Sequence, residues 1–344
     1  MSKKTTGRKD MKRIAAGLAG LLGLAITTAA TSANATELKV SHFMSPMHHM
    51  QVRVLEPMAK ELAEQTGDSL TFRIFPSGEL SKSPAAQWKT ALTGVTDIAF
   101  GLPGYTTENF PRTMLAVSPG LFETAAEATN AIWDDIADIA PDYERAKLLA
   151  LWSTEPAALM TRDKPVRTLA DIKGLKIRTA DQVAAALIDA WGGTPVPLPA
   201  SEIYTAMDTG VIDGLFIDAS GVPSFRLDEV VKYVTLDLPT PSSVFFLVMN
   251  KDSWDGLSDG EKTALDSLSG RQLSLDSAAS NTLEAERGMD MLEKAGREII
   301  RLEDEARQAF VDATKPVAEQ LVADAESRGV ANAADIASAL QKKK

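Results

Sequence analysis

The chain has 344 residues, with 36 lysine and arginine residues against 47 aspartate and glutamate residues, and a net charge of −11. Because phosphate contacts require clustered lysine and arginine, this charge argues against nucleic acid as a partner. The chain has no cysteine, which excludes disulfide bonds and cysteine nucleophiles.

Residues 1–35 are typical of a secretory signal peptide. Six lysine and arginine residues precede an uncharged apolar run at residues 14–26, and small residues follow up to Ala35. This order predicts export to the periplasm with cleavage after Ala35. The run is too short for a membrane span, which needs about 20 apolar residues. The mature chain carries 30 basic against 46 acidic residues, a net charge of −16, and is long enough for two domains.

In chain order, the rest of the sequence predicts strands that alternate with helices. The predicted strands cover residues 37–43, 69–75, 96–101, 147–153, 174–178, 194–198, 211–218, 242–250 and 297–302. The predicted helices cover residues 47–66, a segment opened by Ser83 and Pro84, residues 125–140, 182–191 and 200–209, and most of the chain after residue 302. A capping box at Ser258 and Glu261 predicts a further helix to about residue 295, roughly 55 Å long. This pattern predicts an α/β fold with mostly parallel sheets.

The alternation restarts after residues 154–156, which indicates two lobes. We expect lobe I to contain residues 36–154 plus 242–283, and lobe II to contain residues 155–241 plus 284–344. The long helix is expected to run along both lobes.

Arg178 is the first candidate for a ligand contact. It ends a predicted strand, and Asp181 begins the next helix, where backbone N–H groups favour an anion. Arginine presents a planar fork of donors that matches a carboxylate. The alternative is that Arg178 pairs with a nearby aspartate and faces solvent, and the spacing alone does not decide between the two.

Residues 171–214 resemble the solute-binding proteins of tripartite ATP-independent periplasmic (TRAP) transporters, the DctP family. The resemblance rests on DIKGLKIR at residues 171–178, GTPVP at 193–197, SEIYTAM at 201–207 and VIDG at 211–214. Weaker similarities are FPSGEL at 75–80, TGVTDIAFG at 93–101 and SPGLFE at 118–123. The resemblance implies a two-lobed periplasmic binding protein with two mixed, mostly parallel sheets, a ligand cleft between the lobes, and Arg178 as the residue that binds the substrate carboxylate.

The sequence departs from that family at two positions of the expected site. A second arginine of many members corresponds to Ala158, and an asparagine region after VDG is replaced by residues 215–218, LFID. These changes favour a monocarboxylate, either an aromatic or a keto acid, or a zwitterion whose cation meets Asp218. The alternative ligand is a C4-dicarboxylate, and the alternative for Asp218 is an outward-facing loop acid.

Further candidates for ligand contact lie at or near predicted strand ends or the return strand. A strand-ending glycine lets a backbone approach a ligand, and aromatic side chains suit an apolar pocket, although they are also common in a core. These candidates are Phe43, Gly101, Tyr105, Trp152, Ser153, Phe216 and Phe245.

The expected partners are a small organic acid and the small and large membrane subunits of a TRAP transporter, with the chain itself a monomer. A periplasmic enzyme such as a hydrolase is the alternative of another class, but no histidine lies beyond His49, which leaves most orders of a catalytic triad without a base. A binding protein of an ATP-driven importer, or a sensor, is a third alternative. With only His42, His48 and His49 available, we expect no metal and no cofactor.

Overall fold

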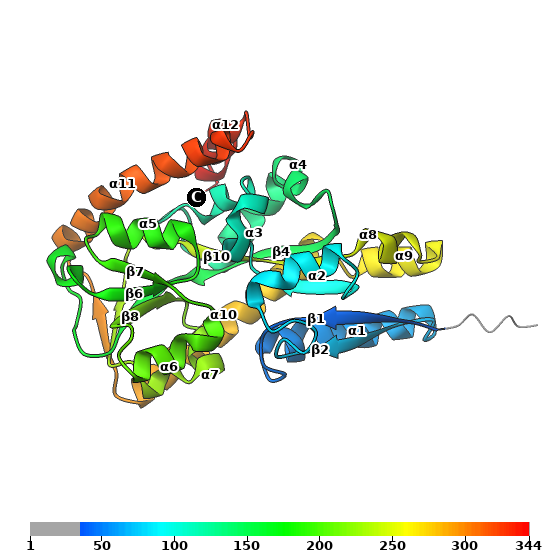
Figure 1. Ribbon diagram of the computed structural model, residues 1–344, viewed down its shortest axis with the longest axis horizontal. Helices are drawn as coiled ribbons and strands as arrows, with labels where there is room; N and C mark the ends of the chain where they lie inside the picture. The colour runs from blue at the N-terminus through cyan, green and yellow to red at the C-terminus, as the bar shows by residue number, and fades with distance from the viewer. Residues whose placement is uncertain (1–34, 344) are drawn as a thin grey trace, which may run out of the picture. The chain divides into compact units, whose positions relative to one another are not determined.

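The computed structural model describes residues 35–343, which form two β-sheets with helices around them (Figure 1). The predicted signal peptide lies outside the described residues, apart from its last residue, Ala35. Within residues 35–343, no helix combines the length and the apolarity needed to cross a bilayer.

Sheet A has the strand order β2-β1-β3-β10-β4. Its strands are β1 (Thr36–Ser41), β2 (Leu70–Phe75), β3 (Ile98–Gly101), β4 (Lys147–Pro156) and β10 (Ser242–Met249). Strand β1 pairs in parallel with β2 and β3, whereas β10 is antiparallel to both of its neighbours. The helices of this part are η1 (Gln51–Leu55), α1 (Glu56–Thr66), α2 (Gln87–Leu92), α3 (Ala125–Asp134) and α4 (Ile136–Ile139).

Sheet B has the strand order β11-β9-β5-β8-β6-β7. Its strands are β5 (Ala158–Thr161), β6 (Lys176–Thr179), β7 (Thr194–Pro197), β8 (Gly214–Ile217), β9 (Tyr233–Leu236) and β11 (Glu298–Arg301). Only β5 runs antiparallel to its neighbours, so both sheets are mixed, as the family resemblance implied. The helices between these strands are α5 (Gln182–Ala190), α6 (Ile203–Asp208) and α7 (Gly221–Phe225).

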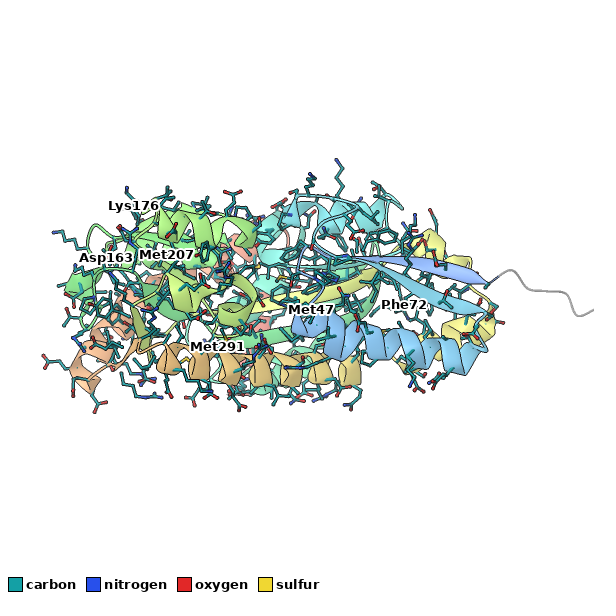
Figure 2. All side chains as sticks on the ribbon, turned by 90° about the horizontal axis from the view of Figure 1, so that it is seen from below. Met47, Phe72, Asp163, Lys176, Met207 and Met291 are labelled. Atoms are coloured by element: carbon teal, nitrogen blue, oxygen red, sulfur yellow. The ribbon has the colours of Figure 1, made fainter. Side chains whose placement is uncertain are left out.

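The last part of the chain is helical except for β11. Its helices are α8 (Lys251–Asp255), α9 (Asp259–Ser267), α10 (Arg271–Lys294), α11 (Asp304–Ser327) and α12 (Ala333–Gln341). Helix α10 contacts β4 and α3 near sheet A and α7 near sheet B, and Figure 2 shows it running along both parts. The expectation of a helix that spans both lobes is therefore confirmed.

The predicted capping box is present, but the helix that it starts is shorter than expected. Ser258 Oγ accepts a hydrogen bond from the Glu261 N–H at 3.3 Å, and Glu261 Oε2 accepts one from the Ser258 N–H at 2.9 Å. The helix ends at Ser267, because Gly270 has a φ of 79° that an L-residue rarely adopts. One predicted helix is therefore two, α9 and α10.

The sequence patterning missed β5 and β9, which are adjacent in sheet B. The chain leaves sheet A at Pro156 and enters sheet B at Ala158, and it returns between Leu236 and Ser242. The exact boundaries of the two lobes stay a prediction, because α11 contacts α5 while α12 contacts the short helical turn Thr113–Val117.

Candidate ligand-binding site

A cavity lies where side chains from both sheets and from α10 converge, and Arg178 is the single lysine or arginine among its described lining residues. Arg178 is next to the last residue of β6 and only 2% exposed. Its Nε donates to the carbonyl oxygen of Leu198 at 2.9 Å, and Nη1 donates to that of Phe216 at 3.5 Å. Among residues 35–343, no carboxylate lies within 4.0 Å of its guanidinium nitrogens. The cation therefore reaches the cavity without an ion-pair partner.

The nearby aspartate is used for a helix cap. Asp181 precedes α5, and its Oδ1 accepts a hydrogen bond from the Ala184 N–H at 2.8 Å. Burial lowers the pKa of Arg178, an effect that the neighbouring Tyr105 and Asp181 oppose. Burial also raises the pKa of Asp181. Because Arg178 is desolvated and unpaired, its interaction with an anionic ligand is more favourable in free energy than that of a surface arginine.

Tyr105 brings a hydroxyl group from the other side of the cavity to Arg178. Tyr105 belongs to the short helical segment Pro103–Asn109, which follows β3. The hydroxyl oxygen accepts a hydrogen bond from the Ala200 N–H at 3.2 Å, and the ring meets that of Phe43 edge-on, with centroids 5.9 Å apart. The neighbouring Gly104 is close to Asp181, because a Cβ on this glycine would lie 2.9 Å from the Asp181 Cβ.

Four aromatic side chains form the apolar wall of the cavity: Phe43, Phe100, Trp152 and Phe245. Their rings are stacked, with centroid distances of 5.8 Å for Phe43–Phe100, 5.5 Å for Phe100–Trp152 and 5.8 Å for Trp152–Phe245. Trp152 and Phe245 are paired positions of β4 and β10, which fixes both on the same face of sheet A. A wall of parallel rings offers a flat ligand a stacking surface.

Asp218 follows β8 and also lines the cavity. Its Oδ1 accepts hydrogen bonds from the Ser220 N–H at 3.1 Å and from Asn281 Nδ2 at 3.3 Å. Burial raises the pKa of Asp218, and the hydrogen bonds from Ser220 and Asn281 partly offset this effect. Asn281 Oδ1 in turn accepts a hydrogen bond from the Glu155 N–H at 3.0 Å, so α10 holds both the cavity loop and the strand that connects the sheets.

Three of the predicted contact residues lie outside the cavity lining. The space beside Gly101 is filled by Phe246, whose Cζ would be 2.4 Å from an added Cβ. Ser153 is buried next to Thr129, whose hydroxyl accepts a hydrogen bond from the Ser153 N–H at 3.0 Å. The Phe216 ring packs edge-on against Trp191 at 5.7 Å. The other six, Arg178, Asp218, Phe43, Tyr105, Trp152 and Phe245, are brought together.

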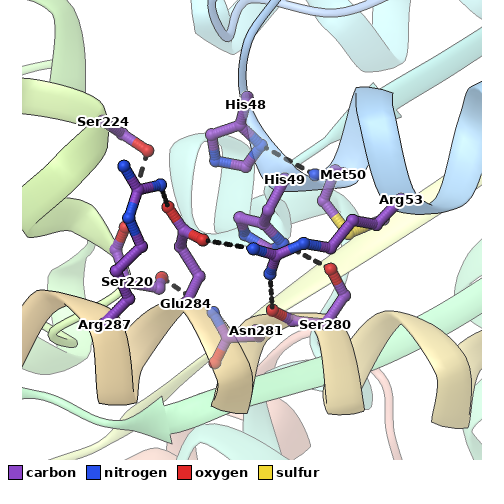
Figure 3. Close-up of polar contacts among 10 residues, drawn as sticks. All are labelled: His48, His49, Met50, Arg53, Ser220, Ser224, Ser280, Asn281, Glu284 and Arg287. Atoms are coloured by element: carbon purple, nitrogen blue, oxygen red, sulfur yellow. Dashed lines mark hydrogen bonds and ion pairs between the residues drawn. The ribbon is translucent and has the colours of Figure 1, made fainter.

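The cavity also contains residues that sequence reasoning did not select, chiefly His48, His49 and Asn281. Figure 3 shows His49 beside α10, where its Nδ1 is 2.9 Å from Ser280 Oγ. In the same view Arg53 reaches Glu284, with Nη2 and Oε2 3.0 Å apart, and Glu284 also pairs with Arg287. These contacts anchor the histidine segment to α10, and no periodicity in the sequence indicates them.

The model of the family described as "Bacterial extracellular solute-binding protein, family 7", DctP, matches residues 40–324. The chain belongs to this family. Members of the DctP family are solute-binding proteins, and the solved structures that resemble this chain are TRAP solute-binding proteins with the same two-lobed fold.

Relatives of this DctP chain differ in the ligands that their names record. A TRAP solute-binding protein of Rhodoferax ferrireducens, solved with copurified benzoate, is 26% identical, with a TM-score of 0.85 over 90% of this chain and 97% of that one. One from Bordetella bronchiseptica with bound (R)- and (S)-mandelate is 27% identical, with a TM-score of 0.82 over 90% and 98%. The ectoine-binding periplasmic protein TeaA of Halomonas elongata is 28% identical over 73% of this chain and 75% of its own length.

Proposed function

We propose that this chain captures an aromatic monocarboxylate in the periplasm and delivers it to the small and large membrane subunits of a TRAP transporter. The observation that carries the proposal is Arg178, a buried guanidinium without an ion pair, in a cavity walled by stacked aromatic rings. The ligand carboxylate would pair with Arg178 in two parallel hydrogen bonds, and its ring would stack on the wall formed by Phe100, Trp152 and Phe245.

The composition of the cavity supports one carboxylate rather than two. Among its described lining residues, Arg178 is the single lysine or arginine, and Ala158 adds no charge in β5. A second carboxylate would be desolvated without a cation, which costs several kcal/mol. The benzoate and mandelate bound by two similar structures agree with this proposal. The chain would act as a monomer without a cofactor and would not alter its ligand.

A zwitterion is the second candidate, because Asp218 reaches the same cavity as Arg178. A ligand with one carboxylate and one ammonium group would pair with both residues. The relative that binds ectoine makes this class worth testing in parallel.

A thermal-shift screen of the chain from Thr36 onward tests these proposals. The panel contains benzoate and mandelate, succinate and malate, a keto acid such as 2-oxobutyrate, and ectoine. A ligand at about 100 times its Kd adds roughly 2.7 kcal/mol of stability. We expect shifts from the aromatic acids, with the ligand recovered intact after incubation. A shift confined to the dicarboxylates would overturn the proposed ligand class, and conversion of the ligand would support an enzyme.

A further inference from the structure

The Tyr105 hydroxyl joins the sheet A part of the fold to the sheet B part. Tyr105 follows β3 of sheet A, and its hydroxyl oxygen accepts a hydrogen bond at 3.2 Å from the N–H of Ala200, which follows β7 of sheet B. Ala200 is the first residue of a short helix, Ala200–Glu202. An N–H group at a helix start has no acceptor within its own helix, so this one is available to the tyrosine. The hydrogen bond therefore holds a loop of one part against a loop of the other.

The same hydroxyl lies beside Arg178. Arg178 Nε donates at 2.9 Å to the carbonyl oxygen of Leu198, two residues before Ala200. Two residues span at most about 7 Å of extended chain, so the backbone of residues 198–200 brings the guanidinium and the hydroxyl close together. Burial lowers the pKa of Arg178, and Tyr105 is near enough to oppose this effect. Both side chains line the ligand cavity, so they meet at one end of it.

Both side chains have hydrogen-bond donors that the protein does not use. A tyrosine hydroxyl has one O–H donor and two acceptor lone pairs. The Ala200 N–H uses a lone pair of Tyr105, and within residues 35–343 the O–H proton has no acceptor. Arg178 uses Nε for Leu198 and one N–H of Nη1 for Phe216, which leaves the other N–H of Nη1 and both of Nη2. The hydroxyl and the guanidinium therefore present free donors at the same end of the cavity.

Tyr105 also lies at the mouth of the cavity. It lines a second, larger groove of about 730 Å³, formed by the segment 82–108 on one side and the segment 180–202 on the other. Tyr105 and Ala180 line both the groove and the ligand cavity, so they mark the place where the two meet. The hydrogen bond between Tyr105 and Ala200 therefore ties the two sides of this mouth together.

We infer that the Tyr105 hydroxyl is a second donor to the ligand carboxylate, and that it fastens the two parts of the fold around the ligand at the same time. The inference rests on the proposed function, because it requires a carboxylate on Arg178. The hydroxyl accepts from the Ala200 N–H and donates its proton to a carboxylate oxygen. Closure then brings the ligand a donor that an open form lacks, and a ligand shifts the equilibrium toward closure only through such differential contacts.

The expected size of the effect follows from a hydrogen bond to a charged group, which is stronger than one between neutral groups. We expect Tyr105→Phe, which keeps the ring and its edge-on contact with Phe43, to weaken the binding of benzoate and of mandelate about 10- to 100-fold. Tyr204→Phe is the matched control, because the Tyr204 hydroxyl donates to Glu229 at 2.8 Å at an exposed position. The control should change the affinity by less than about twofold.

Isothermal titration calorimetry of the chain from Thr36 onward measures these affinities. Equal affinity of Tyr105→Phe and the unmodified chain would overturn the inference while leaving the proposed function intact. Failure of both acids to bind the unmodified chain would overturn the proposed function, and the inference with it.

An NMR signal from the ligand separates a direct contact from a general loss of structure. Benzoate labelled with carbon-13 in its carboxyl group reports the hydrogen bonds of that group when it is bound. At saturating ligand, the bound resonance should move in Tyr105→Phe and stay in place in Tyr204→Phe, while the melting temperatures of the unliganded proteins agree. A bound resonance that is the same in Tyr105→Phe would place the hydroxyl away from the carboxylate and overturn the inference.

A change at Ala200 tests the closing contact by itself. Ala200→Pro removes the N–H group and leaves the tyrosine hydroxyl, and the position suits a proline because Pro199 is extended and Ala200 begins its helix. Stopped-flow dissociation of benzoate, followed by tryptophan fluorescence, should become about tenfold faster. An unchanged rate in the folded variant would overturn the closing contact. If Ala200→Pro fails to fold, the dissociation rate of Tyr105→Phe decides in its place, because that variant loses the same hydrogen bond.

Discussion

Arg178 and Asp218 enter one cavity from neighbouring strands, β6 and β8, yet no ion pair joins them. The two strands are parallel, so their carboxyl ends meet at one edge of sheet B, where ligands of open α/β sheets bind. The separation keeps a positive and a negative group available at different places in the cavity. We propose that the ligand, rather than a protein carboxylate, neutralises Arg178.

Replacing Arg178 should remove most of the ligand affinity. Arg178→Ala should weaken binding at least about 100-fold, because a buried carboxylate would lose its charge partner. Arg178→Lys should recover only part of this loss, since a lysine lacks the planar fork. Calorimetry against the best ligand measures both, with Arg73→Ala as the exposed control. Unchanged affinity in Arg178→Ala would contradict the assignment.

The three histidines should make the protein less stable in acid. Burial lowers the pKa of His42 and His49 to about 4, and that of His48 well below 6.5. Between about pH 4 and pH 6.5 the unfolded chain binds more protons than the folded chain, so the free energy of unfolding rises with pH. This stabilisation is complete above pH 6.5 and is lost toward pH 4, by about 1.4 kcal/mol per pH unit for each histidine. Urea titrations at several pH values measure the slope, which His49→Gln should reduce.

Asp142 should oppose this trend. Its carboxyl group accepts hydrogen bonds from the Thr113 N–H at 2.7 Å and hydroxyl at 2.9 Å, but burial raises its pKa from 3.8 to about 6. The contribution of Asp142 to stability is therefore present below pH 3.8 and lost as the pH rises through about 6. Asp142→Asn should make the increase of unfolding free energy with pH steeper between pH 4 and 6. An unaltered slope would mean that Asp142 titrates normally in the folded protein.

Gly288 should be intolerant of even a methyl group. A Cβ at this position would lie 1.9 Å from the backbone oxygen of Ala219, so α10 and the Asp218 loop would have to separate. We expect Gly288→Ala to lower the free energy of unfolding by about 1–3 kcal/mol. Gly260→Ala, on α9 with no atom within 4 Å of the new Cβ, is the matched control and should change stability little or raise it. Equal effects of the two would contradict the close packing.

Gly104 should affect binding more than stability. A Cβ here would lie 2.9 Å from the Asp181 Cβ, across the edge of the cavity where Tyr105 meets Arg178. Because hinge closure around a ligand brings such surfaces together, Gly104→Ala should weaken ligand binding about tenfold while the unliganded melting temperature changes little. Gly256→Ala, with contacts no closer than 3.4 Å, is the control. A large loss of stability without loss of affinity would contradict this expectation.

Some of the site could be predicted because local patterns determine it. The position of Arg178 follows from an apolar strand that precedes a capped helix, and Trp152 and Phe245 follow from strand alternation. Alternation also explains why Ser153 lies outside the cavity lining. Ser153 follows Trp152 on the strand, so the two side chains face opposite sides of sheet A.

The remaining contacts depend on tertiary packing. Phe216 is as apolar as the wall residues, and only the position of Trp191 shows that it belongs to the core. His48 and Asn281 come from a loop and a helix more than 200 residues apart in the chain, so no local period brings them together. The break after Ser267 depends on the conformation of Gly270, which a single glycine in a helical pattern does not specify. Strand β5 begins two residues after β4 ends, so no linker in the sequence separates the two strands although they belong to different sheets.

The strand order of sheet A has a kinetic consequence. Strand β10 lies between β3 and β4, although residues 157–241 separate it from β4 along the chain. Until Ser242–Met249 is available, β4 lacks the one strand that pairs with it within residues 35–343, and the aromatic wall cannot assemble. Non-local pairing of this kind slows folding, because a long loop must close before the contact forms. A fragment ending before residue 242 should therefore lack the β3–β10–β4 part of sheet A, and with it the Phe245 end of the aromatic wall.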